Sequence, residues 1–463
     1  MTDSQAVIPA GSRSELRHIV REQLKLLLEQ KNYEGVKSLL VPVQPVDIAE
    51  AIEELPQSTQ ILAFRLLKKQ EAIEVYEYLS PEVQQSLLQE FRDQEAIDIV
   101  ESMAPDDRAN LFDELPAKLV RRVLSQLPPE EREATALLLG YKPGTAGRMM
   151  TPEYISIRDN LTASQAQERI RRLAEDREVA YYVYVTGDTK KLVGTISLRD
   201  LILASPDQPI REVMTTDVIY ADTDTDQEEV ARLIQRYDLL ALPIVDHEQL
   251  LLGVVTIDDV LDVVQQEATE DIYTMGGVQA DKEDNYFEIK FPAVVRRRIP
   301  WLMVLILTNI ATVFILSNYE AVLDEVVALA FFTPLLIDTG GNVGAQSSTV
   351  VIRGLGTDEL RYKKPVWVVI RETLAGASLG IILGVIVIGV ALAFVGQAAI
   401  AFTVAISLLI IAVLAATVGA MLPFVFHRLG FDPALMSAPF ITTIVDILGI
   451  LAYLNVAKLF LGI

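Results

Sequence analysis

The segment "DPALMSAPFITTIVDILGI", residues 432–450, places a carboxylate inside a run that is otherwise apolar enough for a membrane span. Asp446 lies fourteen residues beyond Asp432, which is about 20 Å along a helix and therefore deep in a hydrocarbon core of about 30 Å. An unpaired charge there costs on the order of a few kcal/mol at least. Three compensating partners are open: a permeating cation, a neighbouring helix that bonds the protonated acid, or a proton relay.

The rest of the composition favours a cation as this partner. No Lys or Arg lies inside the apolar runs away from their ends, so no basic side chain can neutralise Asp446. The chain has no Cys and only three His, which argues against a soft-metal site and leaves oxygen ligands for a hard cation such as Mg²⁺. Mg²⁺ keeps several of its waters, so two copies of Asp446 on a two-fold axis would suit a hydrated divalent ion.

A second polar stretch inside an apolar run is "PLLIDTGGNVGAQSSTV", residues 334–350. Asn342 and Gln346 lie four residues apart and share one helix face. The glycines either expose carbonyls to an ion or only allow two helices to pack closely. Asp338 could line a pore, pair with a base or lie in a water-filled vestibule.

Five membrane spans are predicted, at 299–317, 326–350, 366–395, 400–426 and 433–460. Basic residues precede the first span, surround the connection between the second and third, and lie between the fourth and fifth: Arg296, Arg297, Arg298, Arg353, Arg361, Lys363, Lys364, Arg371 and Arg428. The positive-inside rule then places the N-terminal part in the cytoplasm and the C-terminus outside the inner membrane. An odd number of spans favours a homodimer in lipid, with a pore on its axis.

The part before the spans is strongly acidic. Residues 1–289 contain 54 acidic and 29 basic residues, whereas nine acidic and eleven basic residues follow, so the charges are about −25 and +2. Such a front disfavours nucleic acid and anionic lipid as partners and attracts cations, although the acids could also serve only solubility. The polar first thirty residues predict no cleavable signal peptide.

Residues 47–139 contain four copies of a repeat with a period of 24 residues, typified by "EAIEVYEYLSPE" and "EAIDIVESMAPDD". The apolar positions Leu55, Leu79, Met103 and Leu127 fall in register, as do Pro81, Pro105 and Pro129. Proline suits the first position of a helix, and Ser80 would be its N-cap. We therefore predict an all-α helical-repeat domain over residues 1–146, with two short helices in each repeat.

From residue 147 a second, α/β pattern occurs twice. "YYVYVTGDTKKLVGTISLRDLI" (181–202) parallels "ALPIVDHEQLLLGVVTIDDVL" (241–261), and "MMTPEYISI" or "VMTTDVIYA" precedes each. The tandem resembles a pair of CBS modules over 147–266, divided into 147–205 and 206–266. In such modules Ser197 with Asp200, and Thr256 with Asp259, would hold the ribose of ATP or another adenine nucleotide, or would only cap a helix. An acidic connecting helix over 267–290 would run continuously to the first span.

These features occur in a fixed order with "EDIYTMGG", "PWL", "GGNVGAQS" and "DPALMSAPFITTIVD". The chain thus resembles the MgtE family of magnesium channels or transporters. The resemblance implies a homodimeric Mg²⁺-selective pore formed by a five-helix domain over 291–463, closed when Mg²⁺ binds the cytoplasmic domains. Asp446 would lie at the pore centre, Asp432 at its cytoplasmic mouth and Asn342 along the ion path, and 267–290 would be a plug helix.

The gate would depend on acidic faces that repel one another until Mg²⁺ bridges them. The candidate bridging acids come from the third repeat, the second CBS copy and the connecting helix: Asp106, Asp107, Glu228, Asp238, Asp259, Asp262, Glu267, Glu270 and Asp271. Each could equally be a solvated surface acid. Asp259 belongs to two hypotheses, one for the nucleotide and one for Mg²⁺.

Three other functions remain open: a transporter for another divalent ion such as Co²⁺, a CBS-type receptor without a pore, and an intramembrane enzyme. The spans contain no His or Cys, and Ser347 and Ser348 have no evident base, so we expect no enzyme. A receptor has no reason to bury Asp446. The sequence offers no second intramembrane acid of evident comparable depth for a proton path, which favours passive permeation.

Overall fold

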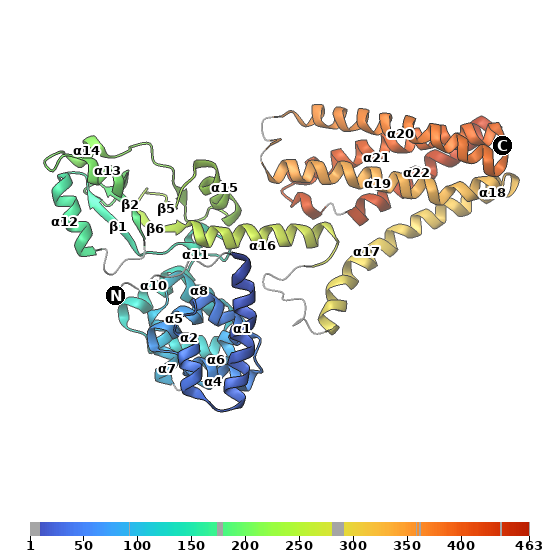
Figure 1. Cartoon of the computed structure of the whole chain (residues 1–463). Coiled ribbons are helices and arrows are strands. Elements are labelled where there is room, and N and C mark those ends of the chain that lie inside the picture. The colour runs from blue at the N-terminus through green and yellow to red at the C-terminus, as the bar shows by residue number, and fades with distance from the viewer. Residues whose placement is uncertain are drawn as a thin grey trace. The chain divides into compact units, whose positions relative to one another are not determined.

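The structure is a computed structural model that describes residues 10–91, 93–173, 179–279, 291–357, 359–360, 363–435 and 438–462. The chain divides into two compact units, an N-terminal unit, Met1–Val264, and a C-terminal unit, Gln265–Ile463. The N-terminal unit contains a helical region followed by two small sheets, and the C-terminal unit is helical (Figure 1). The predicted fold class is thereby confirmed, while the domain boundaries stay predictions.

Short helices form the first part of the N-terminal unit: α1 (Ala10–Glu29), α2 (Tyr33–Leu40), α3 (Pro45–Glu53), α4 (Gln57–Arg65), α5 (Lys69–Glu77), α6 (Pro81–Glu90), α7 (Asp93–Ser102), α8 (Pro105–Glu114), α9 (Ala117–Leu124) and α10 (Pro129–Leu139). From α3 onward, every second helix begins 24 residues after its counterpart. The predicted repeat of two short helices is therefore confirmed. Burial explains why these repeats share an apolar position. The equivalent residues Leu55, Leu79, Met103 and Leu127 are all buried in the hydrophobic core between helices.

Proline begins α3, α6, α8 and α10, the last three as predicted. Pro81 is the first residue of α6, yet the Ser80 side chain makes no capping hydrogen bond. The Ser80 backbone N–H instead donates to the Glu53 carboxylate at the end of α3. Ser80 is therefore the N-cap residue of α6, as predicted, although its side chain does not contribute a capping hydrogen bond.

Two copies of a three-stranded sheet follow the helical region. The first copy contains α11 (Ala146–Met149), β1 (Tyr154–Arg158), α12 (Ala163–Leu173), β2 (Val179–Thr186), β3 (Leu192–Ser197) and α13 (Leu198–Leu203); the second contains α14 (Ile210–Val213), β4 (Ala221–Asp222), α15 (Gln227–Tyr237), β5 (Ala241–Val245), β6 (Leu251–Thr256) and α16 (Ile257–Met275). In each copy the first two strands are parallel and the last two antiparallel. Isolated bridges, such as Thr151 with Val254 and Thr195 with Thr215, join the copies reciprocally.

The C-terminal unit contains α17 (Phe291–Asn318), α18 (Glu320–Glu325), α19 (Ala328–Gly356), α20 (Pro365–Val395), α21 (Ala398–Arg428), the 3₁₀ turn η1 (Pro433–Leu435) and α22 (Ala438–Leu461). Helices α19 to α22 lie side by side as a bundle (Figure 1). Pro433 was expected to begin the last span but lies in η1, and α22 begins at Ala438. Asp446 is therefore about 12 Å from the start of its helix, nearer to that end than the sequence suggested.

Helix α16 is not continuous with α17, contrary to the prediction. It ends at Met275, and Gly277 has a φ of 69°, which reverses the chain direction as helix-terminal glycines do. A Cβ on Gly277 would overlap the Trp301 ring of α17, whose centroid lies 6.2 Å from that of the Phe440 ring in α22. The turn after α16 and the helices α17 and α22 therefore come together at the Trp301 ring. Residues 280–290 of the predicted connecting helix lie outside the described residues.

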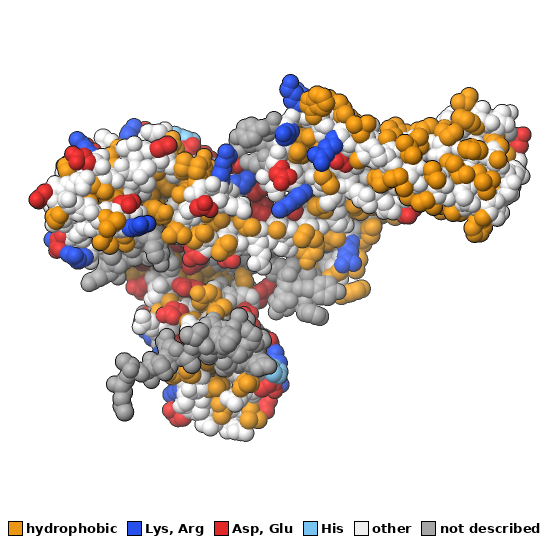
Figure 2. Space-filling view, turned by 45° about the horizontal axis from the view of Figure 1, so that its top comes forward, with side chains coloured by type: hydrophobic (Ala, Val, Ile, Leu, Met, Phe, Trp, Pro, Cys, Tyr) orange, Lys and Arg blue, Asp and Glu red, His pale blue; other side chains and the backbone are white. Residues whose placement is uncertain are grey.

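Four of the five predicted spans correspond to described helices that are long and apolar enough to cross a membrane: α17, α20, α21 and α22. Helix α19 has 29 residues but is not among them, because Asp338, Asn342, Gln346 and several Gly, Ser and Thr residues interrupt its apolar character. It nevertheless packs along α21 and α22. Figure 2 shows apolar side chains gathered over the long helices, as expected for surfaces that face lipid.

The glycines of α19 form a packing face. A Cβ on Gly340 would lie 2.5 Å from Cγ2 of Ile411 in α21, and one on Gly344 would lie 3.0 Å from Cγ2 of Ile441 in α22. In the opposite direction, a Cβ on Gly419 of α21 would overlap the Gly344 backbone oxygen. Of the two readings of these glycines, close helix packing is therefore the one that the structure contains.

We predict that Gly419→Ala lowers the thermal stability of the C-terminal unit. The added methyl group would overlap backbone that cannot rotate away, and overpacking of this kind costs about 1–3 kcal/mol. The matched control is Gly389→Ala in α20, where nothing lies within 4 Å of the new Cβ and alanine favours the helix by up to about 1 kcal/mol. The unfolding midpoint of each full-length variant in detergent, followed by tryptophan fluorescence, tests this. Equal midpoints for the two variants would contradict it.

Candidate functional site

The intramembrane carboxylate of Asp446 lies on α22, where it is partly buried. Thr442, one turn before it, is also partly buried, and Gly449, one turn after it, is buried. The Thr442 and Thr443 hydroxyls donate to the Pro439 carbonyl oxygen and therefore satisfy their own helix. Asp446 is thus the charged group of this stretch of α22.

Helix α19 presents a polar face opposite its glycine face. Asp338, Asn342 and Gln346 are all exposed within the single chain, while Gly340, Gly341 and Gly344 are buried. The Asn342 Nδ2 donates to Asp338 Oδ2 at 3.3 Å. The glycines and the polar side chains, which alternate along the sequence, therefore lie on different faces of α19. The glycine face packs against the bundle, and the polar face does not.

The packing register brings Asp338 to the level of Asp446. Gly341 of α19 contacts Thr442 of α22, and Gly344 contacts Ile441 and Val445, so the two helices run in opposite directions. One turn back from Gly341 is Asp338, and one turn on from Thr442 is Asp446. Their charges are close enough to interact. Among the described residues, no Lys or Arg forms an ion pair with either carboxylate.

This pair corrects one statement drawn from the sequence. Asp338 is a second acid at comparable depth, so the lack of one no longer argues against a proton path. The sequence signal was weak because a register between two separate helices cannot be read from the spacing within either helix.

A second acidic group lies where α16, α19 and η1 approach one another in the C-terminal unit. Burial, and then the negative charges of Asp432, Glu267 and Glu270, raise the pKa of Asp271 above its usual range, while Arg353 partly opposes the shift. The structure therefore brings together four acids that the sequence singled out. Arg353, at the end of α19, is the member that sequence reasoning did not include in this group.

Asp432 also has a local structural role. Its Oδ1 accepts from the Ala434 backbone N–H at 2.8 Å, which caps the turn η1. The residue is exposed, so a second carboxylate oxygen is available to a ligand. Structural capping and ion binding are therefore compatible at this position.

A third acidic group lies between the helical region and the second sheet copy. Burial, and then Asp258 and Asp262 on α16, raise the pKa of Asp107 on α8, and burial followed by Asp258 raises the pKa of Asp262. Asp107 and Asp262 were predicted, whereas Asp258 was not. Asp258 and Asp262 lie four residues apart and share a helix face, which is the signal that could have identified Asp258.

Apolar contacts and one arginine hold these like charges together. Ala109 of α8 and Leu138 of α10 share a core with residues of α11, α15 and the second sheet. The buried Arg148 of α11 donates from Nη2 to the Ala109 carbonyl oxygen at 2.9 Å and pairs with Asp113 Oδ2 at 2.6 Å. The docking of α8 is therefore stabilised by burial and by Arg148 against repulsion among the acids.

The remaining predicted acids lie outside this group. Asp106 is buried in the first turn of α8, Glu228 pairs with Arg232 at 3.3 Å, and Asp238 ends α15 with a φ of 50°. Asp259 accepts from the Thr256 hydroxyl at 2.6 Å. In the described parts of the chain, no three His, Asp or Glu side chains are close enough to hold a metal ion as they stand.

The two candidate nucleotide pairs have the same internal geometry. The Ser197 hydroxyl donates to Asp200 Oδ2 and the Thr256 hydroxyl to Asp259 Oδ2, each at 2.6 Å. Ser197 also caps α13, because its oxygen accepts from the Asp200 backbone N–H at 3.1 Å. The capping reading therefore holds for the first copy.

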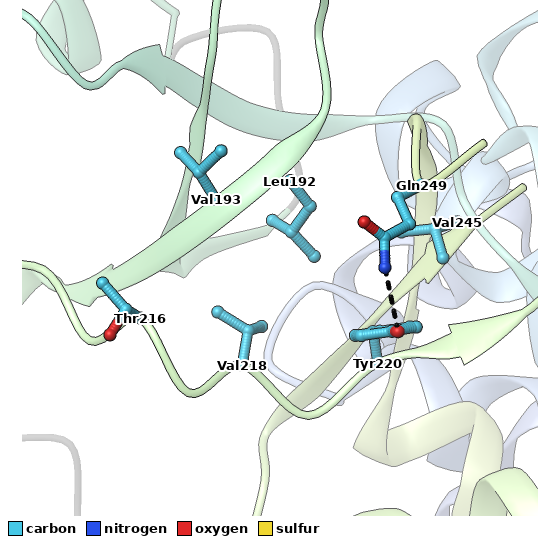
Figure 3. Close-up of a pocket in the computed structure, with 7 residues that line it drawn as sticks. All are labelled: Leu192, Val193, Thr216, Val218, Tyr220, Val245 and Gln249. Atoms are coloured by element: carbon cyan, nitrogen blue, oxygen red, sulfur yellow. Dashed lines mark hydrogen bonds between the residues drawn. The ribbon is translucent and has the colours of Figure 1, made fainter.

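A separate cavity of about 180 Å³ lies between the two sheet copies (Figure 3). Leu192 of β3 and Gln249 of the β5–β6 turn face Val218 and Tyr220 across it, and the Gln249 Nε2 donates to the Tyr220 hydroxyl at 3.2 Å. Neither Ser or Thr–Asp pair lines this cavity.

Three family models match the chain in the order of its structural parts. The MgtE intracellular N domain matches residues 43–144, the CBS domain matches 146–207 and 210–266, and MgtE, described as a divalent cation transporter, matches 333–456. Among solved structures, the cytosolic domain of the Mg²⁺ channel MgtE in complex with ATP is similar with a TM-score of 0.50 and 37% identity over 52% of this chain and 99% of its own. The soluble part of a magnesium transporter is similar with the same TM-score and 31% identity, over 54% of this chain and 99% of its own.

Two whole-length relatives give the same result. The magnesium transporter MgtE of Thermus thermophilus is 41% identical over 96% of this chain and 99% of its own length. The magnesium transporter MgtE of Bacillus subtilis is 36% identical over 94% of this chain and 96% of its own length. By these matches over nearly its whole length, the chain belongs to the MgtE family of divalent cation transporters.

Proposed function

We propose that this chain forms a Mg²⁺-selective channel whose ion path includes Asp446 and Asn342. The observation that carries the proposal is a carboxylate about two turns inside the last apolar helix, close to an uncovered polar helix face, with no basic partner in the described residues. A permeating cation supplies the missing counter-charge. Carboxylate and carboxamide oxygens are hard ligands, and Mg²⁺ retains waters through which they can act. The relatives named magnesium transporters support Mg²⁺ over Co²⁺ as the substrate.

The channel is proposed to be a homodimer embedded in lipid. In a single chain, Asp338, Asn342 and Gln346 are exposed although they lie at membrane depth. Polar groups at this depth are tolerated only against protein or in a water-filled cavity. A second copy related by a two-fold axis would enclose these side chains around a common aqueous path, which a single bundle leaves open on one side.

The proposed orientation places the N-terminal unit in the cytoplasm and the C-terminus outside. Arg296–Arg298 lie near the start of α17, Arg353 near the end of α19, Lys363 and Lys364 before α20, and Arg428 at the end of α21. All these ends fall on one side of the membrane if the helices alternate in direction. The positive-inside rule assigns that side to the cytoplasm.

Cytoplasmic Mg²⁺ is proposed to close the channel by binding acids that otherwise repel one another. Glu267, Glu270 and Asp271 on α16 lie near Asp432 at the start of the last span, so an ion bound there would hold α16 at the proposed mouth. Asp107 and Asp262 would act in the same way between the helical region and the second CBS copy. Each bound ion shifts the equilibrium between open and closed channel only to the extent that it binds the closed state more tightly than the open state.

An adenine nucleotide is a further proposed ligand of the CBS pair. Ser197 with Asp200, and Thr256 with Asp259, place a hydroxyl and a carboxylate together at equivalent positions of the two copies, which is a suitable arrangement for ribose hydroxyls. The similar cytosolic domain whose structure contains ATP supports this ligand. Asp106, Glu228, Asp238 and Asp259 remain weaker Mg²⁺ candidates, because each already has a local role.

The first prediction is that the wild-type chain conducts Mg²⁺ in liposomes and that Asp446→Asn lowers the flux at least about tenfold, equivalent to ~1.4 kcal/mol. Asparagine keeps the shape and removes the charge, whereas Asp446→Glu, the control, keeps the charge. Dye-reported Mg²⁺ influx measures the effect, and size-exclusion chromatography verifies the dimer. Full flux through Asp446→Asn would remove the pore assignment. No wild-type flux under any condition would favour the receptor without a pore.

The second prediction concerns the mouth acids. Replacing Glu267, Glu270 and Asp271 together by Gln, Gln and Asn should raise the soluble-side Mg²⁺ concentration that half-closes the channel by about tenfold, if the closed state loses ~1.4 kcal/mol of ion binding. The control removes three exposed acids elsewhere, Glu74, Glu82 and Glu133, by substitution with Gln. An unchanged closing concentration in the first variant would exclude a sensor at this group.

The third prediction follows from the raised pKa of Asp107. Because the folded-state pKa lies above the unfolded value, protonation favours docking of α8, and this stability is lost as pH rises through the folded value. Without Mg²⁺, amides of α8 in the wild type should therefore exchange faster with deuterium at pH 7 than at about pH 4, near the usual pKa of an aspartate, after correction for intrinsic rates. Asp107→Asn should remove most of that difference, whereas Glu133→Gln should retain it. Identical exchange in both variants would contradict the repulsion.

A further inference from the structure

Asp338 lies next to Asp446 and Asn342, the two residues of the proposed ion path. Three contacts establish its level: Gly340 lies against Val445, Gly341 against Thr442, and Gly344 against Ile441. These contacts define one antiparallel register between α19 and α22. Continued by one turn, that register places Asp338 beside Asp446. The position follows from backbone packing and does not depend on the side-chain rotamer of either acid.

The surroundings of Asp338 exclude its ordinary structural roles. It has no ion pair with Lys or Arg among the described residues, and its hydrogen-bond partner is the neutral amide of Asn342. It does not cap a helix, since it lies ten residues inside α19. It is also exposed in the single chain, and a charge cannot face hydrocarbon at this depth without a cost of a few kcal/mol or more. Water and cations are the partners that remain.

We propose that Asp338 is a second carboxylate of the ion path, which gives the path its preference for divalent over monovalent cations. The inference rests on the proposed channel and adds one residue to it. Asp446 on α22 and Asp338 on α19 then act on the same ion from two helices, and Asn342 holds the Asp338 carboxylate in place.

The physical reason is the dependence of attraction on ion charge. A divalent ion gains twice as much as a monovalent ion from each added carboxylate at the same distance. The added charge therefore widens the difference between Mg²⁺ and Na⁺ or K⁺, even when the contact is made through water. Acidic rings in cation channels act by this principle. Asn342 alone, being neutral, cannot supply this discrimination.

The test compares Asp338→Asn with Asp338→Glu in liposomes that contain the full-length chain. Asp338→Asn should lower the ratio of Mg²⁺ to Na⁺ flux by about tenfold and raise the Mg²⁺ concentration for half-maximal flux, while Asp338→Glu should restore both toward wild type. Glu372→Gln in α20 is the control, because it removes one negative charge from the same unit away from this pair. A purely structural role would lower the flux of both ions without changing their ratio.

The outcomes separate this inference from the proposed channel. A wild-type flux that Asp446→Asn abolishes and Asp338→Asn leaves unchanged, in rate and in ion ratio, would overturn the role of Asp338 and retain the channel. An equal loss of selectivity in Glu372→Gln would also overturn it, since the effect would then be one of total charge. If the wild-type chain conducts no ion, the proposed channel itself fails and the inference fails with it.

Discussion

A carboxylate at membrane depth needs a counter-charge, and the Lys and Arg residues of the spans all lie near the helix ends, away from this depth. Asp446 and Asp338 lie at one level of the bundle without an ion pair among the described residues. Their burial in lipid would be costly. The bundle avoids this cost by leaving the polar face of α19 uncovered, where water, a cation and a second copy can meet it. The proposed dimer and the proposed substrate both follow from this constraint.

The glycines of α19 make that arrangement possible. Gly340, Gly341 and Gly344 bring its backbone close to α21 and α22, so dispersion contacts hold the helix in the bundle without its polar side chains. If larger residues occupied these positions, α19 would separate from α22, and Asp338 would no longer lie beside Asp446. Packing on one face of the helix therefore determines the chemistry available at the other.

The same balance of like charges occurs outside the spans. Asp107 lies near Asp258 and Asp262, and the docking is maintained by apolar burial and by Arg148. Asp271 lies near Asp432 and two further acids, with Arg353 as partial compensation. Both groups are assembled at a cost that a divalent cation would remove. The proposed gate would act through this balance, because a bound cation would weaken the repulsion while the apolar burial stays the same.

The sequence by itself determined the features that depend on local periodicity. The 24-residue repeat, the two sheet copies and the apolar runs each repeat along the chain, so their helices and strands could be placed without knowledge of tertiary contacts. Asp446 was also identifiable, since a lone acid in an apolar run is a local anomaly. Ser80 could likewise be placed as the N-cap of α6, whereas the bond from its backbone N–H to Glu53 of another repeat could not be read from the local sequence.

Tertiary structure decided which acids meet. Asp258 and Asp259 are adjacent in sequence, yet a helix turns about 100° between them, so Asp258 joins Asp107 whereas Asp259 bonds Thr256. Asp338 and Asp446 are over a hundred residues apart, and only the register of α19 against α22 brings them together. Spacing along one element fixes which side chains share a face, but the partner of that face is set by packing between elements, which no local pattern contains.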